Sequence, residues 1–322
     1  MCIEFRTFAR LAGAALRTVR QDNVRQDNVR QDNVRRGTAR TPGAVTSVAV
    51  LAVALAGCVD QPKPYCISTV APFAVKLLEV NRTGACTSFG PEGFNADPEI
   101  SLNPFYLRDK KGQPDYAHGS VAIQTAELGS LYYAAEGAGV SNSAMDGQLY
   151  SRGDFSTARP NDEGMCDVPE LDLTHVVLAE IPAVPDDPAT ADADESSPGQ
   201  PAVDVSLSWS NLRVYVTAAS FGTQMSADLV DTRLTPTGES CEISYQALGL
   251  APAVSCAATD ENGDPLLNDD GSPQLNPDAC NSEADAAAGR PTGSGISPNA
   301  AFSCDPVTAY CLLDGDHIPA LR

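Results

Sequence analysis

The sequence lacks the short motifs that mark the common catalytic sites. It contains no G-x-S-x-G nucleophile turn, no H-E-x-x-H zinc motif, no phosphate-binding P-loop and no G-x-G-x-x-G dinucleotide fingerprint. Histidine is scarce as well, with three residues in the chain. These absences exclude the enzyme designs that depend on those motifs. They leave enzymatic status open and favour a non-enzymatic role that needs no cofactor.

The sequence also lacks an apolar run long enough to cross a bilayer. Its strongest run covers residues 48–56, whereas a spanning helix needs about 20 apolar residues. A run of this length fits the apolar core of an export signal, and Arg35, Arg36 and Arg40 supply the positive charge that precedes such a core. The pattern therefore predicts that the chain is exported.

The apolar run ends in the tetrad Leu55-Ala56-Gly57-Cys58. This tetrad resembles the lipobox of bacterial lipoproteins. The resemblance implies that the Cys58 thiol receives a diacylglycerol, that residues 1–57 are removed, and that acyl chains such as palmitate anchor the mature protein to a membrane. Two or more acyl chains hold a protein firmly, since each buried methylene contributes about 0.8 kcal/mol.

The residues that follow Cys58 bear on the destination of the protein. Val59 occupies the second mature position and Asp60 the third. In lipoprotein sorting, by the same resemblance, an acidic residue directly after the cysteine favours retention in the inner membrane. We therefore expect an envelope location in which the outer membrane is favoured over the inner membrane.

Residues 21–35 repeat Gln-Asp-Asn-Val-Arg three times. A five-residue period matches neither a helix nor a strand and cannot bury one face. We expect residues 1–57 to be a disordered leader followed by the signal peptide. We hypothesise that translation starts near Val34, which would leave a compact signal.

Positive charge is scarce after the leader. Residues 1–57 hold nine arginines and four acidic residues, whereas residues 58–322 hold 12 basic and 38 acidic residues, a net charge of −26. Phosphates would be repelled by such a surface, which excludes nucleic acid as a partner. The same charge argues against general attraction to anionic lipid headgroups.

The cysteines contain no C-x-x-C pair, which argues against thioredoxin-type redox chemistry and paired zinc knuckles. Cys2 lies in the leader and Cys58 is the expected anchor. An even number then remains as disulfide candidates: Cys66, Cys86, Cys166, Cys241, Cys256, Cys280, Cys304 and Cys311. Eight cysteines allow 105 pairings, and the sequence leaves the choice among them open.

Strand patterns dominate the mature chain. Residues 203–209 alternate apolar and polar side chains, with Trp209 on the apolar parity. The parity slips at Ser210–Asn211, which predicts a β-bulge or a tight turn there. Residues 241–247 alternate in the same way. Further strands are predicted at residues 73–80, 100–107, 121–124 and 174–181. A turn is expected at residues 81–84, and Pro104 predicts an edge or bulged strand.

One helix is predicted at residues 126–136, with Thr125 as its N-cap. The fold class is therefore mainly β, with sandwich-like antiparallel sheets, one short helix, a long acidic loop and a disulfide-stapled, loop-rich C-terminal region. The expected organisation is a cleaved leader, a tether, a mainly-β domain with a disordered acidic loop, and a tail that disulfides hold without a core. Their boundaries are residues 1–57, 58–65, 66–257 with the loop at 184–201, and 258–322.

An eight-residue repeat in the tail, residues 262–269 and 270–277, places Asn-Gly and Asp-Gly turns in equivalent positions. The oxygens nearby are weak candidates for calcium ligands: Asp260, Asn262, Asp264, Asp269 and Asp270. Counted from Asp260, the glycine and glutamate positions of an EF-hand are not met. The pattern favours turn formation and assigns no metal.

The histidines give weak functional signals. His175 lies in an apolar run and is expected to pack against the core, whereas His317 follows Asp316 near the C-terminus.

The sequence favours a lipid-anchored envelope protein with a structural or binding role, whose partner is an envelope protein or a glycan. The alternative is an envelope hydrolase with a site dispersed over loops, for which His118 or His175 would need an acid and a serine beside it.

Overall fold

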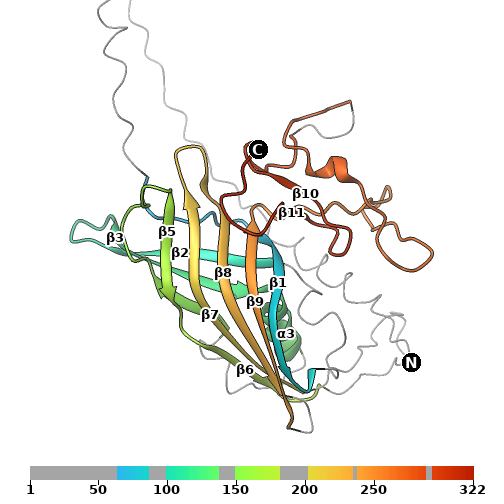
Figure 1. Cartoon of the computed structure of the whole chain (residues 1–322), viewed down its shortest axis with the longest axis horizontal. Coiled ribbons are helices and arrows are strands. Elements are labelled where there is room, and N and C mark those ends of the chain that lie inside the picture. The colour runs from blue at the N-terminus through green and yellow to red at the C-terminus, as the bar shows by residue number, and fades with distance from the viewer. Residues whose placement is uncertain (1–63, 87–98, 138–148, 182–201, 235–237, 288–291) are drawn as a thin grey trace, which may run out of the picture. The chain divides into compact units, whose positions relative to one another are not determined.

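The computed structural model describes residues 64–86, 99–137, 149–181, 202–234, 238–287 and 292–322 (Figure 1). These residues belong to one compact unit that spans Gln61–Arg322. The leader, Cys58 and the acidic loop at 184–201 lie outside the described residues. No helix within the described ranges is long and apolar enough to span a membrane.

Antiparallel strands form a nine-stranded sheet in the order β4-β3-β2-β1-β9-β8-β7-β5, with β6 also pairing with β7. Its strands are β1 (Phe73–Gly84), β2 (Glu99–Arg108), β3 (Pro114–Thr125), β4 (Ser151–Asp154), β5 (Met165–Glu170), β6 (Thr174–Leu178), β7 (Val203–Val216), β8 (Phe221–Leu234) and β9 (Ser240–Leu250). Strands β10 (Phe302–Cys304) and β11 (Cys311–Leu313) pair separately. The predicted mainly antiparallel β-structure is confirmed.

The sheet bends back on itself, so that β2 and β3 cross behind β7, β8 and β9 in the view of Figure 1. Backbone hydrogen bonds also link β4 and β5, the strands at the two ends of the sheet, to residues that follow the other strand. The Asp172 N–H donates to the Arg152 carbonyl, and the Ser156 N–H donates to the Asp167 carbonyl, both at 2.8 Å. The two facing layers are therefore halves of one continuous sheet, and one apolar cluster fills the space between them.

Helix α3 (Ala126–Gly137) covers part of this interior and contacts β2, β3 and β6. The Thr125 hydroxyl accepts the Leu128 N–H at 3.3 Å, which satisfies one of the open donors at the helix start. Leu128 and Leu131 are buried on the inner face. Both the helix and its N-cap are as predicted.

The parity slip in β7 is a bulge, which was one of the two predicted alternatives, and not a tight turn. The register with β8 shifts between Ser210 and Arg213, and Asn211 adopts a left-handed φ of 52°. Asparagine tolerates this conformation better than most residues. Trp209 lies before the bulge and is buried in the core, also as predicted.

Strand β1 departs from prediction, because residues 81–84 continue the strand instead of forming a turn. A bulge between Glu79 and Asn81 lets the chain stay paired with β9 as far as Gly84. Gly84 has φ 87°, and a Cβ there would collide with the Ser240 carbonyl oxygen. The residues that predicted a turn therefore mark the end of β1, at Gly84.

The tail packs on the outer face of the sheet. Leu248 and Leu250 of β9 share a second apolar cluster with Phe302, Leu313 and Ile318 of the tail. The disulfides predicted for the tail are present, but the expectation that the tail lacks a core was wrong. The end of β9 is apolar on both faces because the tail covers one of them.

All eight cysteines expected to pair do so. The disulfides are Cys66–Cys166, Cys86–Cys241, Cys256–Cys304 and Cys280–Cys311. The first two join distant parts of the sheet domain, with sequence separations of 100 and 155 residues. Of the other two, Cys280–Cys311 lies within the tail, and Cys256–Cys304 joins the tail to the residue at the end of the predicted mainly-β domain.

Candidate functional site

A charged cluster lies on the interior side of the sheet, where β8 passes beneath the first turn of α3. We call it the interior cluster and define it by Glu127, Asp231 and Arg233. The inward series of β8 runs through Ala227 and Leu229 before it reaches the two charged residues. Polar groups on the core side of a strand need partners, because burial removes their contacts with water.

Arg233 supplies those partners. Its Nη1 and Nη2 atoms donate to the two carboxylate oxygens of Glu127 at 3.0 and 2.9 Å, and its Nε lies 3.1 Å from Asp231 Oδ2. A guanidinium that binds a carboxylate through two parallel hydrogen bonds is held in a fixed orientation. The interior cluster therefore ties helix α3 to strand β8.

Burial changes the proton affinity of Asp231, whose side chain is 2% exposed. Removal from water raises the pKa of Asp231 to about 7, although attraction from Arg233 acts in the opposite direction. Burial also disfavours the charge on Arg233, but Glu127 and Asp231 outweigh that effect and raise the pKa of Arg233. The cluster thus holds a permanent cation beside an acid that titrates near neutral pH.

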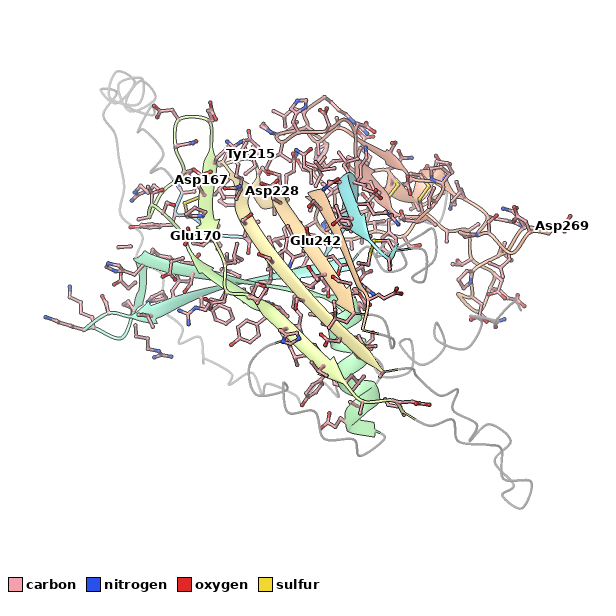
Figure 2. All side chains as sticks on the ribbon, turned by 60° about the horizontal axis from the view of Figure 1, so that its bottom comes forward. Asp167, Glu170, Tyr215, Asp228, Glu242 and Asp269 are labelled. Atoms are coloured by element: carbon pink, nitrogen blue, oxygen red, sulfur yellow. A yellow bond between two sulfur atoms is a disulfide. The ribbon has the colours of Figure 1, made fainter. Side chains whose placement is uncertain are left out.

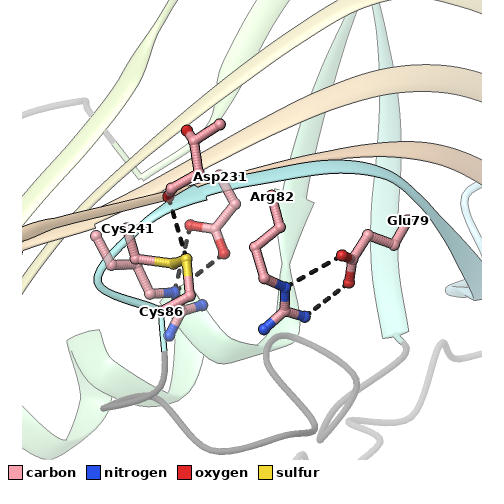
Figure 3. The surroundings of a disulfide bond; sticks show 7 residues. Glu79, Arg82, Cys86, Asp231 and Cys241 are labelled. Carbon is pink, nitrogen blue, oxygen red and sulfur yellow. Dashed lines mark hydrogen bonds and ion pairs between the residues drawn. A yellow bond between two sulfur atoms is a disulfide. The ribbon is translucent and has the colours of Figure 1, made fainter.

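The disulfide Cys86–Cys241 lies next to the interior cluster (Figure 3). Cys241 is the direct cross-strand partner of Arg233 on β9. An exposed pair, Arg82 with Glu79, lies nearby, with its Nη2–Oε2 distance at 2.7 Å. Covalent and ionic links therefore lie together where β1 and β8 end and β9 begins.

The interior cluster was not predicted from the sequence, although the alternation along β8 pointed to it. Asp231 and Arg233 share the odd-numbered parity of the buried Ala227 and Leu229, so an uninterrupted strand would carry them inward. Glu127 could not be linked to them, since it lies about one hundred residues earlier. The chemistry of the cluster is that of a structural clamp with one titrating acid, and its carboxylates are occupied by the guanidinium.

The histidines lie on the surface. His175 Nε2 lies 2.9 Å from Asp204 Oδ1, and the imidazole is 48% exposed, so the expected core packing was wrong. Thr174 and Val176 take the inward positions of β6, and alternation turns His175 outward. Ser206 is the cross-strand neighbour of His175, but within the described chain no hydrogen bond joins that serine to the imidazole.

The other two histidines also pair with acids. His118 Nδ1 lies 2.9 Å from Asp115, and His317 Nδ1 lies 3.0 Å from Asp316; both imidazoles are 75% exposed. The hydrogen bond from His118 and the hydrogen bond from His317 are the main reasons that the pKa values of Asp115 and Asp316 are lowered. These exposed pairs lack the enclosure that acid–base catalysis uses.

The weak calcium candidates serve turn formation. Asp260 Oδ1 accepts the backbone N–H groups of Asn262 and Asp264, and these bonds, the Asp264 one first, lower the pKa of Asp260. Asp270 accepts from the Ser272 hydroxyl and N–H. The two repeats thus form equivalent turns, and Asp269 lies at the outer end of the tail in Figure 2.

Three sulfur atoms from Cys256 and the tail lie close enough together to bind one metal ion. The Sγ atoms of Cys256, Cys280 and Cys304 lie within 4.8 Å of one another. Each of them is committed to a disulfide, which removes the thiolate that a metal would need.

The outer face of the sheet carries acids on β5, β8 and β9, with β7 lying between β5 and β8. Asp167 on β5, Asp228 on β8 and Glu242 on β9 form what we call the acidic face (Figure 2). Arg213 lies 3.3 Å from Asp167, and Asn211 donates to Asp228 at 2.8 Å. The acidic face therefore presents carboxylates whose described contacts include the Arg213 guanidinium and the Asn211 amide.

A protein-family model matches the part of the chain that carries the interior cluster and the acidic face. The family model MlpA matches residues 77–252, more than half of the chain. The chain belongs to the MlpA family. The MlpA match runs from β1 to just beyond β9, so it includes α3, the interior cluster and the acidic face, and excludes both Cys58 and the tail after residue 252. No curated protein matches the chain.

Proposed function

We propose that this MlpA-family protein is a lipid-anchored envelope lipoprotein with a structural or partner-binding role. The observation that carries the proposal is the pairing of cysteines. All eight that follow Cys58 pair with one another, so Cys58 is left over in the expected mature chain. The lipobox resemblance supplies the use for this residue, which is thioether formation with diacylglycerol.

The disulfides also support the proposal that the protein lies outside the cytoplasm. Four disulfides form and persist where the environment is oxidising, which in bacteria means beyond the cytoplasmic membrane. The apolar run at residues 48–56 supplies the export signal. Val59 after the anchor favours the outer membrane over the inner membrane.

A binding role is supported by the way the charged groups are used. The charged groups of the interior cluster bind one another. The imidazoles of His118 and His175 are exposed to solvent. The acidic face also presents Asp228 and Glu242 to solvent. We propose an envelope protein or a glycan as the partner, recognised through hydrogen bonds and charge on this face.

The test of the anchor compares two cysteine variants in the producing cell. Cys58→Ala should release the protein from washed membranes into a soluble fraction, while the matched control Cys2→Ala should leave it membrane-bound. Release by both variants or by neither would contradict the proposal. Partner binding is tested by chemical crosslinking in intact cells, with Asp228→Asn/Glu242→Gln expected to reduce the captured product.

A further inference from the structure

The β2–β3 hairpin, residues 106–118, differs in character from the rest of the mature chain. It carries the cations Arg108, Lys110 and Lys111 against two carboxylates, in a chain whose residues 58–322 have a net charge of −26. Figure 1 shows the hairpin projecting beyond the sheet, and Figure 2 shows nitrogen-tipped side chains along it. Cations are thus gathered on a protruding element of an acidic protein.

Apolar side chains are exposed on the hairpin and, at Phe105, directly before it. Leu107 is 67% exposed, Phe105 is 49% exposed and Tyr116 is 38% exposed. Tyr116 stacks on Tyr65 with ring centroids 4.7 Å apart, and Arg159 lies 4.3 Å above the Tyr65 ring. Aromatic rings and long cationic side chains together are typical of surfaces that sit at the headgroup layer of a membrane.

The position of Tyr65 links this surface to the membrane that would hold the proposed anchor. Tyr65 lies seven positions after Cys58, and an extended chain of seven steps spans at most about 25 Å. The chain is then fixed at Cys66, whose N–H donates to the Ala158 carbonyl and whose carbonyl accepts the Tyr106 hydroxyl at 2.7 Å. The hairpin therefore begins beside the point where an anchored chain would leave the bilayer.

We infer that the β2–β3 hairpin is a membrane-docking element that rests its cations and exposed apolar side chains on the anionic headgroup layer holding the anchor. The inference rests on the proposed lipid anchor and adds an orientation to it. The acidic sheet and tail would be turned away from the bilayer. Anchoring raises the local concentration of headgroups, so a contact too weak to hold a free protein is still populated.

The chain contains a matched control for this hairpin. In its turn, Asp109 N–H donates to the Gln113 carbonyl, and Asp109 Oδ1 accepts the N–H groups of Lys111 and Gln113. The tail turn that begins at Asp260 has the same backbone bonds, with Asp260 Oδ1 accepting from Asn262 and Asp264. The two turns share their geometry and differ in charge.

The experiment uses the full acylated protein in vesicles of phosphatidylcholine with phosphatidylglycerol. Flotation with the vesicles reports the anchor, and amide hydrogen exchange reports the hairpin. We expect exchange in residues 106–118 to slow at least about fivefold relative to the Cys58→Ala protein in solution, and exchange in the turn at residues 260–264 to stay unchanged.

Two variants identify the groups responsible. Lys110→Glu/Lys111→Asn gives these two positions the side chains found in the tail turn. Losing two cations alone should weaken an anionic contact by roughly 25-fold, at about fivefold for each cation, and the added carboxylate should weaken it further. Leu107→Ser should also reduce protection, whereas Val307→Ser, at an equally exposed position in the tail, should not. Thermal unfolding of each variant checks that the fold is retained.

The outcomes separate the two proposals. A protein that does not float contradicts the anchor, and the docking inference fails with it. A protein that floats with an unprotected hairpin overturns the docking inference alone. Protection that depends on protein density, or that survives Lys110→Glu/Lys111→Asn, would assign the hairpin to a contact between proteins and would also overturn it.

Discussion

Arg233 and Glu127 join parts of the chain that lie 106 residues apart, through two parallel hydrogen bonds of 3.0 and 2.9 Å. The contact fixes the first turn of α3 against the inner face of β8. Because the MlpA match contains both residues, the clamp belongs to the shared domain rather than to the tail.

Removing the guanidinium should destabilise the domain strongly. In Arg233→Ala, Asp231 and Glu127 remain as neighbouring acids without their common partner, and breaking a buried pair in this way costs about 3 kcal/mol. The matched control is Arg82→Ala, which removes the exposed i,i+3 partner of Glu79 and should cost less than about 1 kcal/mol. Urea unfolding with the disulfides intact measures both. Equal losses would show that the interior cluster is energetically an ordinary surface pair.

Asp231 should make stability depend on pH. An aspartate in the unfolded chain releases its proton near pH 4, whereas folding raises the pKa of Asp231 to about 7. The folded state therefore binds more protons between these values, and its stability falls as pH rises through that window. The loss amounts to at most about 4 kcal/mol, from about 1.4 kcal/mol for each pH unit.

Asp231→Asn isolates this effect, because the amide does not titrate. The free energy of unfolding of the original protein minus that of Asp231→Asn should decrease from pH 4 to pH 7 and then level off. A difference that is flat over this window, or that rises, would show that Asp231 is ionised in the folded protein throughout.

Gln224 should hold the C-terminus to the sheet. Its side chain is buried, its Oε1 accepts the Ala320 N–H at 2.9 Å, and its Nε2 donates to the Ala320 carbonyl at 3.2 Å. Gln224→Ala leaves both backbone groups without these partners, at a cost of about 1–3 kcal/mol. The C-terminal residues should then exchange amide hydrogens faster and be clipped sooner by carboxypeptidase.

The control for Gln224 is Gln246→Ala. Gln246 also donates to a tail carbonyl, that of Asp316 at 3.2 Å, but the contact is exposed and water can replace it. Its loss should leave exchange at Ala320 unchanged. If the two variants loosen the C-terminus equally, burial is not what gives the Gln224 contact its strength.

Alternation along the sequence was sufficient to predict the strands that bury one face. Residues 203–209 and 241–247 follow it, and the parity slip located the bulge at Asn211. Helix α3 was found from its apolar face and from Thr125. Local pattern decides these elements because each side chain faces either core or water.

Prediction failed where a distant segment changes the environment. Leu248 and Leu250 face outward on β9 and are buried only because the tail covers them. A second prediction failed for a local reason. His175 was assigned to the core from its apolar neighbours, although alternation with Thr174 and Val176 turns its side chain outward.

The site depended even more on distant contacts. Asp231 and Arg233 lie inward against the usual preference of charged residues, and their partner Glu127 is brought close only by the bend of the sheet. The four disulfide pairings, likewise, follow from the register of strands and from the packing of the tail rather than from cysteine spacing.

The most direct test of the lipoprotein account is the intact mass and N-terminal peptide of the protein purified from its own cell envelope. The account predicts a mature chain that begins at Cys58, carries a diacylglycerol on the thiol and retains four disulfides. A chain that begins elsewhere, or an unmodified Cys58 in the membrane-bound protein, would contradict it.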